Sequence, residues 1–118
     1  MILIVGGMSS GKKTYAISEL GYNDEDISDG VVNDKPVVYN LQEVVKSQDA
    51  DNSDSLIDTL LTKEVVICNE MGAGIIPAAS EDRKWRENTG RLCVLLAKEA
   101  TQVIRMTCGI PNIIKRKR

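Results

Sequence analysis

A glycine-rich segment near the start of the chain has the residue types and the spacing of a phosphate-binding loop. Gly6 is followed by four residues and then by Gly11 and Lys12, which satisfies the P-loop pattern G-x-x-x-x-G-K. In such a loop successive main-chain N–H groups point at phosphate oxygens, and the lysine reaches the outer phosphates as a point charge. The segment therefore predicts a site for a nucleoside triphosphate. The alternative is a glycine-rich turn between a strand and a helix that binds nothing.

The next position departs from the P-loop pattern. Lys13 stands where a Ser or Thr hydroxyl normally ligates Mg²⁺. Its ammonium group could neutralise phosphate charge in place of the metal, or point to solvent. A register shifted by one residue, Gly7 to Thr14, recovers a Lys-Thr pair but puts Lys12 at the second glycine, where a side chain crowds the turn. Mg²⁺ binding is therefore doubtful, and we assign no metal ligand.

A second glycine-containing loop, "NEMGAGIIP", follows the apolar run Val65–Cys68. Glu70 comes just after that run, and a carboxylate past a buried strand beside a P-loop commonly holds a metal-bound water or positions a nucleophile. The alternative is that Glu70 caps N–H groups of its own loop. Lys12 and Glu70 are our candidate catalytic residues.

In the first half of the chain the elements are short. Residues 2–5 predict a strand buried on both faces, and residues 12–20 predict a helix. Residues 22–35 are acidic and rich in turn formers, which indicates a mobile surface loop with at most one short strand at Val31-Val32. A second short strand is expected at 37–39 and a helical turn or two at 41–45.

The second half has clearer periodicity. Residues 47–55 are a polar linker with helix caps at Asn52 or Ser53, and residues 56–61 place their leucines and isoleucine on one helix face. A long helix is expected from Ser80 to about Ala100. Two strands follow in "TQVIRMTCG" and "IPNIIK", and the chain ends in a basic, disordered tail, 115–118.

Alternating strands and helices predict a single α/β domain over residues 1–118. We expect a P-loop NTPase-like three-layer sandwich with a mostly parallel sheet, reduced in size. Parallel sheets bind ligands outside the carboxyl ends of their strands. Both glycine-rich loops lie at that edge, so we expect them to converge.

The two loops and the segments after them resemble the adenosylcobinamide kinase/adenosylcobinamide-phosphate guanylyltransferase family of cobalamin biosynthesis. That family opens with a strand and "GGxxSGKS", where this chain has "GGMSSGKK". Its later signatures are "NEVGxGIVP", a spaced "R-x-F-R-D", "GR-x-NQ", and "GIP" with a lysine beyond. The corresponding segments here are "NEMGAGIIP", "RKWRENTGRL" and "CGIPNIIK", and the matching blocks cover more than half of the chain.

The resemblance implies a set of site residues. The nucleotide, ATP or GTP, is expected to contact Gly6, Gly7, Ser9, Ser10, Gly11, Lys12, Lys13 and Thr14. The candidates on the side of the acceptor substrate, a corrinoid, are Asn69, Gly72, Gly74, Arg83, Arg86 and Arg91, with Pro77 shaping the second loop. The arginines match basic positions of the family; the alternative is that they are solvated helix charges. The family also implies a homo-oligomer, which would help so small a domain to bury apolar surface.

The chain departs from the family at several points. It has no histidine, whereas the family carries the guanylyl group on one, and the segment that would hold it is shortened. A central strand with its own acidic residue is expected to be missing from 20–60, and Cys93-Val94 replace the Asn-Gln pair. Together with Lys13, these departures remove the guanylyltransferase step and leave the kinase step open.

Composition restricts the remaining classes. The net charge is −2, three widely spaced cysteines are expected to be reduced thiols, and no run is long enough to cross a bilayer. We expect a cytoplasmic protein with no membrane partner, and nucleic acid is an unlikely partner because no aromatic platform accompanies the basic tail. The main functions that remain are a nucleoside-triphosphate-binding cobinamide kinase and a catalytically inactive nucleotide-binding module with a regulatory or scaffold role. A minor alternative is a protein that binds no nucleotide and uses the family fold as an interaction surface.

Overall fold

The fold is built on one six-stranded sheet. A computed structural model describes residues 1–47, 53–70 and 80–117. The strand order is β2-β3-β4-β1-β5-β6, and every pairing is parallel except that of β5 with β6. The strands are β1 (Ile2–Gly6), β2 (Ile27–Asp29), β3 (Val37–Tyr39), β4 (Val65–Asn69), β5 (Gln102–Thr107) and β6 (Ile110–Arg116).

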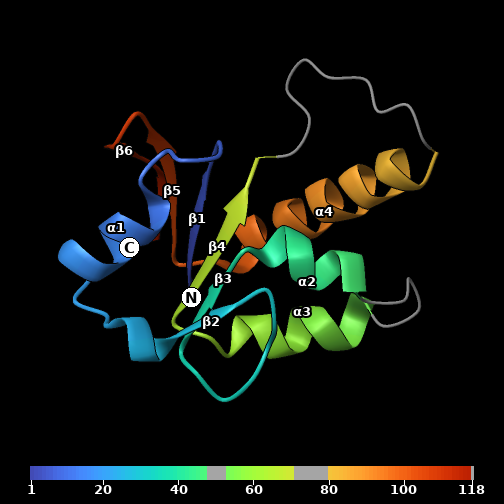
Figure 1. Cartoon of the computed structure of the whole chain (residues 1–118), viewed down its shortest axis with the longest axis horizontal. Coiled ribbons are helices and arrows are strands. Elements are labelled where there is room, and N and C mark those ends of the chain that lie inside the picture. The colour runs from blue at the N-terminus through green and yellow to red at the C-terminus, as the bar shows by residue number, and fades with distance from the viewer. Residues whose placement is uncertain (48–52, 71–79, 118) are drawn as a thin grey trace.

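Helices cover both faces of the sheet, and the expected three-layer α/β sandwich with a mostly parallel sheet is confirmed. Figure 1 shows α1 (Lys12–Ser18) on one side and α2 (Leu41–Ser47), α3 (Ser53–Leu61) and α4 (Ser80–Glu99) on the other. Successive residues of a strand point to opposite faces. In β1 Leu3 accordingly packs in the core under α2, α3 and α4, whereas Ile4 packs in the core under α1.

The helices lie close to their expected positions. The first ends at Ser18 rather than at residue 20, and Gly21 beyond it takes the left-handed conformation with φ 83°. The α3 helix begins at Ser53, at the edge of the described residues, so the expected cap at position 52 lies outside them. None of the described helices is long and apolar enough to cross a membrane.

The prediction of a mobile loop over residues 22–35 is wrong for its first half. A short 3-10 helix, Asp24–Asp26, leads into strand β2, and no strand forms at Val31-Val32. Ser28 is buried in β2 because its hydroxyl donates to the Val37 carbonyl, 3.1 Å away. The strand pairs with β3, which confirms the short strand expected at 37–39, so the interval 20–60 holds two strands.

The prediction of a disordered tail over residues 115–118 is wrong for residues 115–117, and Arg118 lies outside the described residues. Lys115 and Arg116 belong to β6, which forms a hairpin with β5. The Lys115 ammonium donates to the carbonyls of Ala97 and Lys98, at 2.8 Å each, in the last turn of α4. A cation there satisfies carbonyls that have no partner within the helix.

Gly6 is the last residue of β1 and the first residue of the loop over residues 6–12, which is called the P-loop here after its sequence pattern. A Cβ at this position would lie 2.6 Å from both the Met106 carbonyl oxygen and the Ser10 hydroxyl. At Gly7 a Cβ would meet nothing within 4 Å. The crowding at Gly6 therefore comes from the neighbouring strand and from the loop itself.

We predict that Gly6→Ala destabilises the protein and that Gly7→Ala does not. The methyl group at position 6 must push back main chain of β5, which costs about 1–3 kcal/mol, whereas the change at position 7 stays within about 0.5 kcal/mol. Urea unfolding of the two variants measures the difference. Equal stability of the two variants would show that the loop does not pack as described.

We also predict that Lys115→Ala lowers the free energy of unfolding by about 1 kcal/mol, because two helix-end carbonyls lose their donor. Lys117→Ala is the matched control, since it retains the main-chain bond from Lys117 N–H to the Thr101 carbonyl. Thermal unfolding compares the two. A Lys115→Ala protein as stable as the control would contradict the capping role.

Candidate functional site

The two glycine-containing loops meet at the carboxyl edge of the sheet. Strands β1 and β4 are parallel neighbours with Gly6 opposite Asn69, and the Glu70 N–H donates to the Gly6 carbonyl at 2.8 Å. A cavity of about 290 Å³, here called the P-loop cavity, opens between them. Its lining residues are Gly7, Met8, Ser9, Ser10, Glu70, Arg105, Met106, Thr107 and Cys108. The expected convergence is thus found for the described part of the second loop.

The P-loop main chain has the form of an anion-binding nest. Ser9 and Gly11 both take positive φ, 59° and 92°. Within the part of the chain that the structure describes, the N–H groups of Met8, Ser9 and Gly11 donate to no other residue. Successive N–H groups left without a partner in such a turn form a concave surface that favours anions.

Lys12 is folded back onto the loop that precedes it. Its side chain is 4% exposed, and its ammonium donates to the Gly7 carbonyl at 2.5 Å and to the Ser10 hydroxyl at 3.3 Å. Burial lowers the pKa of Lys12, an effect that the nearby Cys68 and Glu70 partly oppose. A phosphate over the loop would offer this ammonium a better partner than a carbonyl and a hydroxyl.

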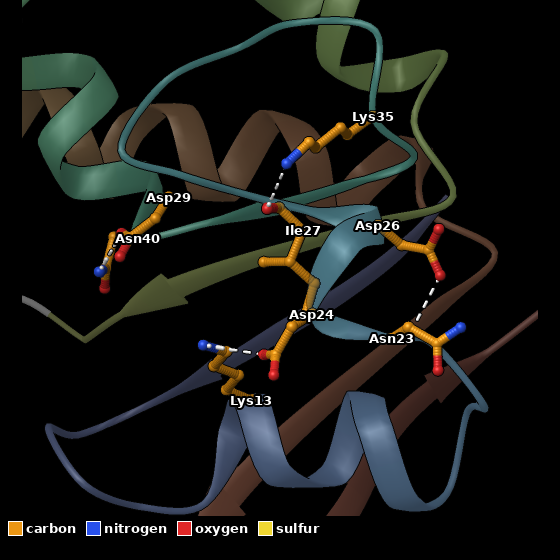
Figure 2. A network of polar contacts seen from close by, with 8 residues as sticks. All are labelled: Lys13, Asn23, Asp24, Asp26, Ile27, Asp29, Lys35 and Asn40. Atoms are coloured by element: carbon orange, nitrogen blue, oxygen red, sulfur yellow. Dashed lines mark hydrogen bonds and ion pairs between the residues drawn. The ribbon is translucent and has the colours of Figure 1, made fainter.

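Lys13 is directed away from the P-loop cavity. Figure 2 shows it extended toward Asp24, whose carboxylate is 3.3 Å from its ammonium. The ammonium also lies 5.6 Å from the centre of the Tyr39 ring, a cation–π distance. Lys13 lines neither cavity at the P-loop. The structure therefore places the Lys13 ammonium beside the 3-10 helix Asp24–Asp26 and strand β3 rather than in the P-loop cavity.

Glu70 forms a two-pronged ion pair with Arg105, a residue that the sequence analysis did not identify. Arg105 Nε is 2.8 Å from Glu70 Oε1, and Arg105 Nη2 is 3.1 Å from Oε2. Because β1 lies between β4 and β5, the two side chains flank the start of the P-loop from opposite sides. An arginine within a strand gives no motif, and only the register of the sheet reveals this contact.

The described residues do not fit a magnesium ion at the position usual for P-loop proteins. Position 13 offers an ammonium in place of a hydroxyl oxygen, and the Glu70 carboxylate is already occupied by a guanidinium. Among the described residues there is also no group of three or more His, Cys, Asp or Glu side chains able to hold a metal. Oxygen ligands are what Mg²⁺ requires.

The turn between β5 and β6 packs directly on the P-loop. The Gly109 N–H donates to the Ser10 carbonyl at 2.9 Å, and a Cβ at Gly11 would lie 3.2 Å from the Gly109 Cα. Beyond this contact lies a second cavity of about 490 Å³, here called the α1 cavity. It is lined by Gly11, Thr14, Tyr15, Ser18, Glu19, Met106, Gly109 and Pro111. The two cavities thus adjoin the P-loop on either side of one turn.

Among the described residues, the structure connects none of the remaining candidates directly with the two cavities. Gly72, Gly74 and Pro77 lie outside the described residues. Arg83, Arg86 and Arg91 are on α4 and line neither cavity.

The α4 helix is nevertheless coupled to the second loop through Gln42, a buried residue that no motif singled out. The Trp85 ring N–H donates to the Gln42 carbonyl at 2.6 Å. The Gln42 side-chain oxygen in turn accepts from the Asn69 N–H at 3.1 Å.

The three cysteines are free, as expected. A hydrogen bond with Cys93 and burial together raise the pKa of the Cys68 thiol. A thiol with a raised pKa is a poor nucleophile at neutral pH. Cys68 therefore serves as core beneath the second loop.

Comparison with known proteins gives one family. Residues 32–114, more than half of the chain, match the family model described as cobinamide kinase / cobinamide phosphate guanyltransferase. The P-loop precedes this range, which runs from the segment before β3 into β6.

The other comparisons add little. No curated protein matches the chain. A solved structure described as a structural study of a Pyrococcus horikoshii OT3 protein is 9% identical, covers 100% of this chain and 74% of its own, and has a TM-score of 0.45.

Within the matched range, Glu70 of the second loop and Gly109 of the final hairpin both donate hydrogen bonds to carbonyls of the P-loop. The family is named for acting on cobinamide and for guanyl transfer, which implies nucleotide and cobinamide substrates. The chain belongs to the cobinamide kinase / cobinamide phosphate guanyltransferase family.

Proposed function

We propose that the protein binds a purine nucleoside triphosphate with its phosphates over the P-loop. The observation that carries this proposal is that one cavity unites residues 7–10 with Glu70, and that the Lys12 ammonium lies on the loop that lines it. Main-chain N–H groups of the loop supply donors, and Lys12 supplies charge. Lys12 and Glu70 are the proposed catalytic residues.

The nucleoside part is assigned to the α1 cavity. Met106 lines both cavities, and Gly11 of the P-loop lines the α1 cavity. A ligand whose phosphates lie on the P-loop can therefore extend into the α1 cavity. Tyr15 and Pro111 offer apolar surface to a planar base, while Thr14 and Ser18 offer hydroxyl groups.

The proposed reaction is transfer of the γ-phosphoryl group to a hydroxyl of cobinamide. The hydroxyl oxygen forms the new bond to phosphorus and gives up its proton to water, the bond from phosphorus to the bridging oxygen breaks, and the nucleoside diphosphate leaves. Such a reaction asks the protein mainly for positioning and charge neutralisation. Glu70 would orient the attacking hydroxyl. The chain contains no histidine, and we propose the kinase step without guanylyl transfer.

One observation favours a second function, a catalytically inactive nucleotide-binding module with a regulatory or scaffold role. The Glu70 carboxylate is held by Arg105 and Lys13 is held by Asp24, so two groups near the loop are occupied when no ligand is bound. Binding without turnover is the expected behaviour if these pairs persist in the complex.

Two further expectations from the sequence are kept as proposals. Arg83 and Arg91 are exposed on α4, and they are assigned to the acceptor side together with Arg86 because they match basic positions of the family. Self-association is supported by β6, an edge strand on which Ile110 and Ile114 are exposed.

Calorimetry with ATP, GTP and tripolyphosphate tests the binding mode. We predict one binding site per chain and a nucleotide affinity at least about 10-fold above that of tripolyphosphate, because the nucleoside buries surface in the α1 cavity. Failure of all three ligands to bind would end the proposal. Equal affinity for nucleotide and tripolyphosphate would remove the assignment of the nucleoside to the α1 cavity.

Turnover separates the two functions. With cobinamide and the nucleotide that binds more tightly, a kinase releases nucleoside diphosphate and phosphorylated cobinamide in equal amounts, and Lys12→Ala abolishes both. An inactive module binds the nucleotide and releases neither product.

The pKa of Lys12 leads to a pH-dependent prediction. Burial lowers the pKa of Lys12 below the usual 10.5, and bound phosphate favours the charged form and raises it again. Nucleotide binding should therefore take up protons at alkaline pH, and affinity should fall as the pH rises through the pKa of Lys12 in the free protein. Calorimetry in buffers of different ionisation enthalpy measures the uptake.

Lys12→Arg is the control for this measurement, because a guanidinium stays charged throughout the range. Proton uptake that persists unchanged in Lys12→Arg, or that is missing from the parent protein at every alkaline pH, would contradict the assignment of Lys12 as the phosphate-binding ammonium.

A further inference from the structure

We propose that Arg105 is a second phosphate-binding cation, which exchanges Glu70 for the terminal phosphate and so makes nucleotide binding independent of Mg²⁺. The inference rests on the proposed function, since it concerns the same cavity. It concerns a residue in β5 that no motif identified.

Arg105 is placed where a terminal phosphate would lie. Among the described residues that line the P-loop cavity it is the only one with a positive charge. It stands opposite Val5 on the central strand β1, one position before the pair of Gly6 and Met106 that leads into the P-loop. Its guanidinium is half-exposed at 54%, which leaves it accessible to a ligand that enters the cavity.

The two lysines after Gly11, Lys12 and Lys13, do not supply enough positive charge to neutralise a triphosphate. The Lys13 ammonium is held by Asp24, outside the cavity. Lys12 is a single buried ammonium whose pKa is lowered by that burial. The described residues also present no magnesium site, as the geometry at position 13 and at Glu70 shows. A triphosphate over this loop therefore needs a further positive charge from the protein, and Arg105 can supply it.

The geometry of the ion pair suits an exchange of partners. Arg105 contacts the carboxylate through two nitrogens, Nε and Nη2, and a guanidinium can bind two phosphate oxygens through the same pair of nitrogens. Glu70 is 33% exposed in its side chain, so it can be solvated once the arginine turns away. The exchange would place Arg105 on the nucleotide and free the Glu70 carboxylate for the acceptor hydroxyl. The pair thus keeps Glu70 neutralised until nucleotide is present.

The test measures the affinities of ATP and GTP for the full chain in EDTA and in excess Mg²⁺, by calorimetry. We expect binding in EDTA to be within a few-fold of that in Mg²⁺. We expect Arg105→Gln to weaken binding in EDTA by about 10- to 100-fold, as for loss of a hydrogen-bonded charge pair. Arg116→Gln, at the opposite end of the same hairpin, is the matched control and should leave the affinity unchanged.

Glu70→Gln separates this inference from a metal-binding role of Glu70. If Arg105 exchanges partners, Glu70→Gln removes the carboxylate that competes with phosphate for Arg105 and that repels the phosphate. The nucleotide affinity in EDTA should therefore rise about 3- to 10-fold. If Glu70 holds magnesium instead, Glu70→Gln should leave the affinity in EDTA unchanged and weaken it only in Mg²⁺. Thermal unfolding of each variant checks that it remains folded.

The outcomes are decisive in either direction. Nucleotide binding that requires Mg²⁺, or that survives Arg105→Gln unchanged, overturns the inference while the proposed nucleotide site stands. Absence of any binding by the parent protein overturns both. Loss of affinity in Arg105→Gln with a gain in Glu70→Gln supports the exchange of partners.

Discussion

The parallel pairing of β1 with β4 is the constraint on which the rest of the site depends. It sets Gly6 opposite Asn69 and lets the Glu70 N–H donate to the Gly6 carbonyl, so the P-loop and the second loop leave the sheet side by side. The runs that pair are short, continuously apolar and rich in β-branched residues, as expected of strands buried under helices on both faces. Burial of these strands on both faces thus fixes where the chemistry-bearing side chains emerge.

A second contact closes the site on the side of β1 that faces away from β4. The hairpin of β5 and β6 brings Gly109 onto the P-loop, and β5 carries Arg105 to the same edge. Three segments that are far apart in the sequence therefore surround the loop. The second loop and β5 are joined by the ion pair of Glu70 with Arg105, while Lys13 after the P-loop pairs with Asp24 of the 3-10 helix. An incoming polyanion can compete with Glu70 for the arginine.

The sequence predicts the parts of this arrangement that follow from local pattern. Residues 2–5 and 65–68 were predicted as buried strands because their apolar runs are continuous, and α4 was predicted from its period of buried residues such as Leu92 and Leu96. The P-loop and Glu70 can be identified from the sequence because glycine spacing indicates a phosphate-binding turn and because a carboxylate directly after a buried strand indicates a candidate catalytic position. The approach of the two loops also follows from the expectation that both leave a parallel sheet at its carboxyl edge.

The parts that were missed depend on tertiary contacts. Strand β2 has one apolar residue, and its Ser28 is buried only because Val37 supplies an acceptor from the neighbouring strand. Lys115 was predicted to lie in a solvated tail, yet the carbonyls at the end of α4 hold it in place. Arg105 looks like an ordinary solvent-facing charge until the register places it against Glu70.

The central claim is that the two loops form one phosphate site, and a residue-resolved NMR titration with ATP in EDTA tests it most directly. The account predicts that the amide signals of Met8, Ser9 and Gly11 shift together with that of Glu70, with a single affinity. Shifts confined to one of the two loops, or different affinities at Gly11 and at Glu70, would contradict it.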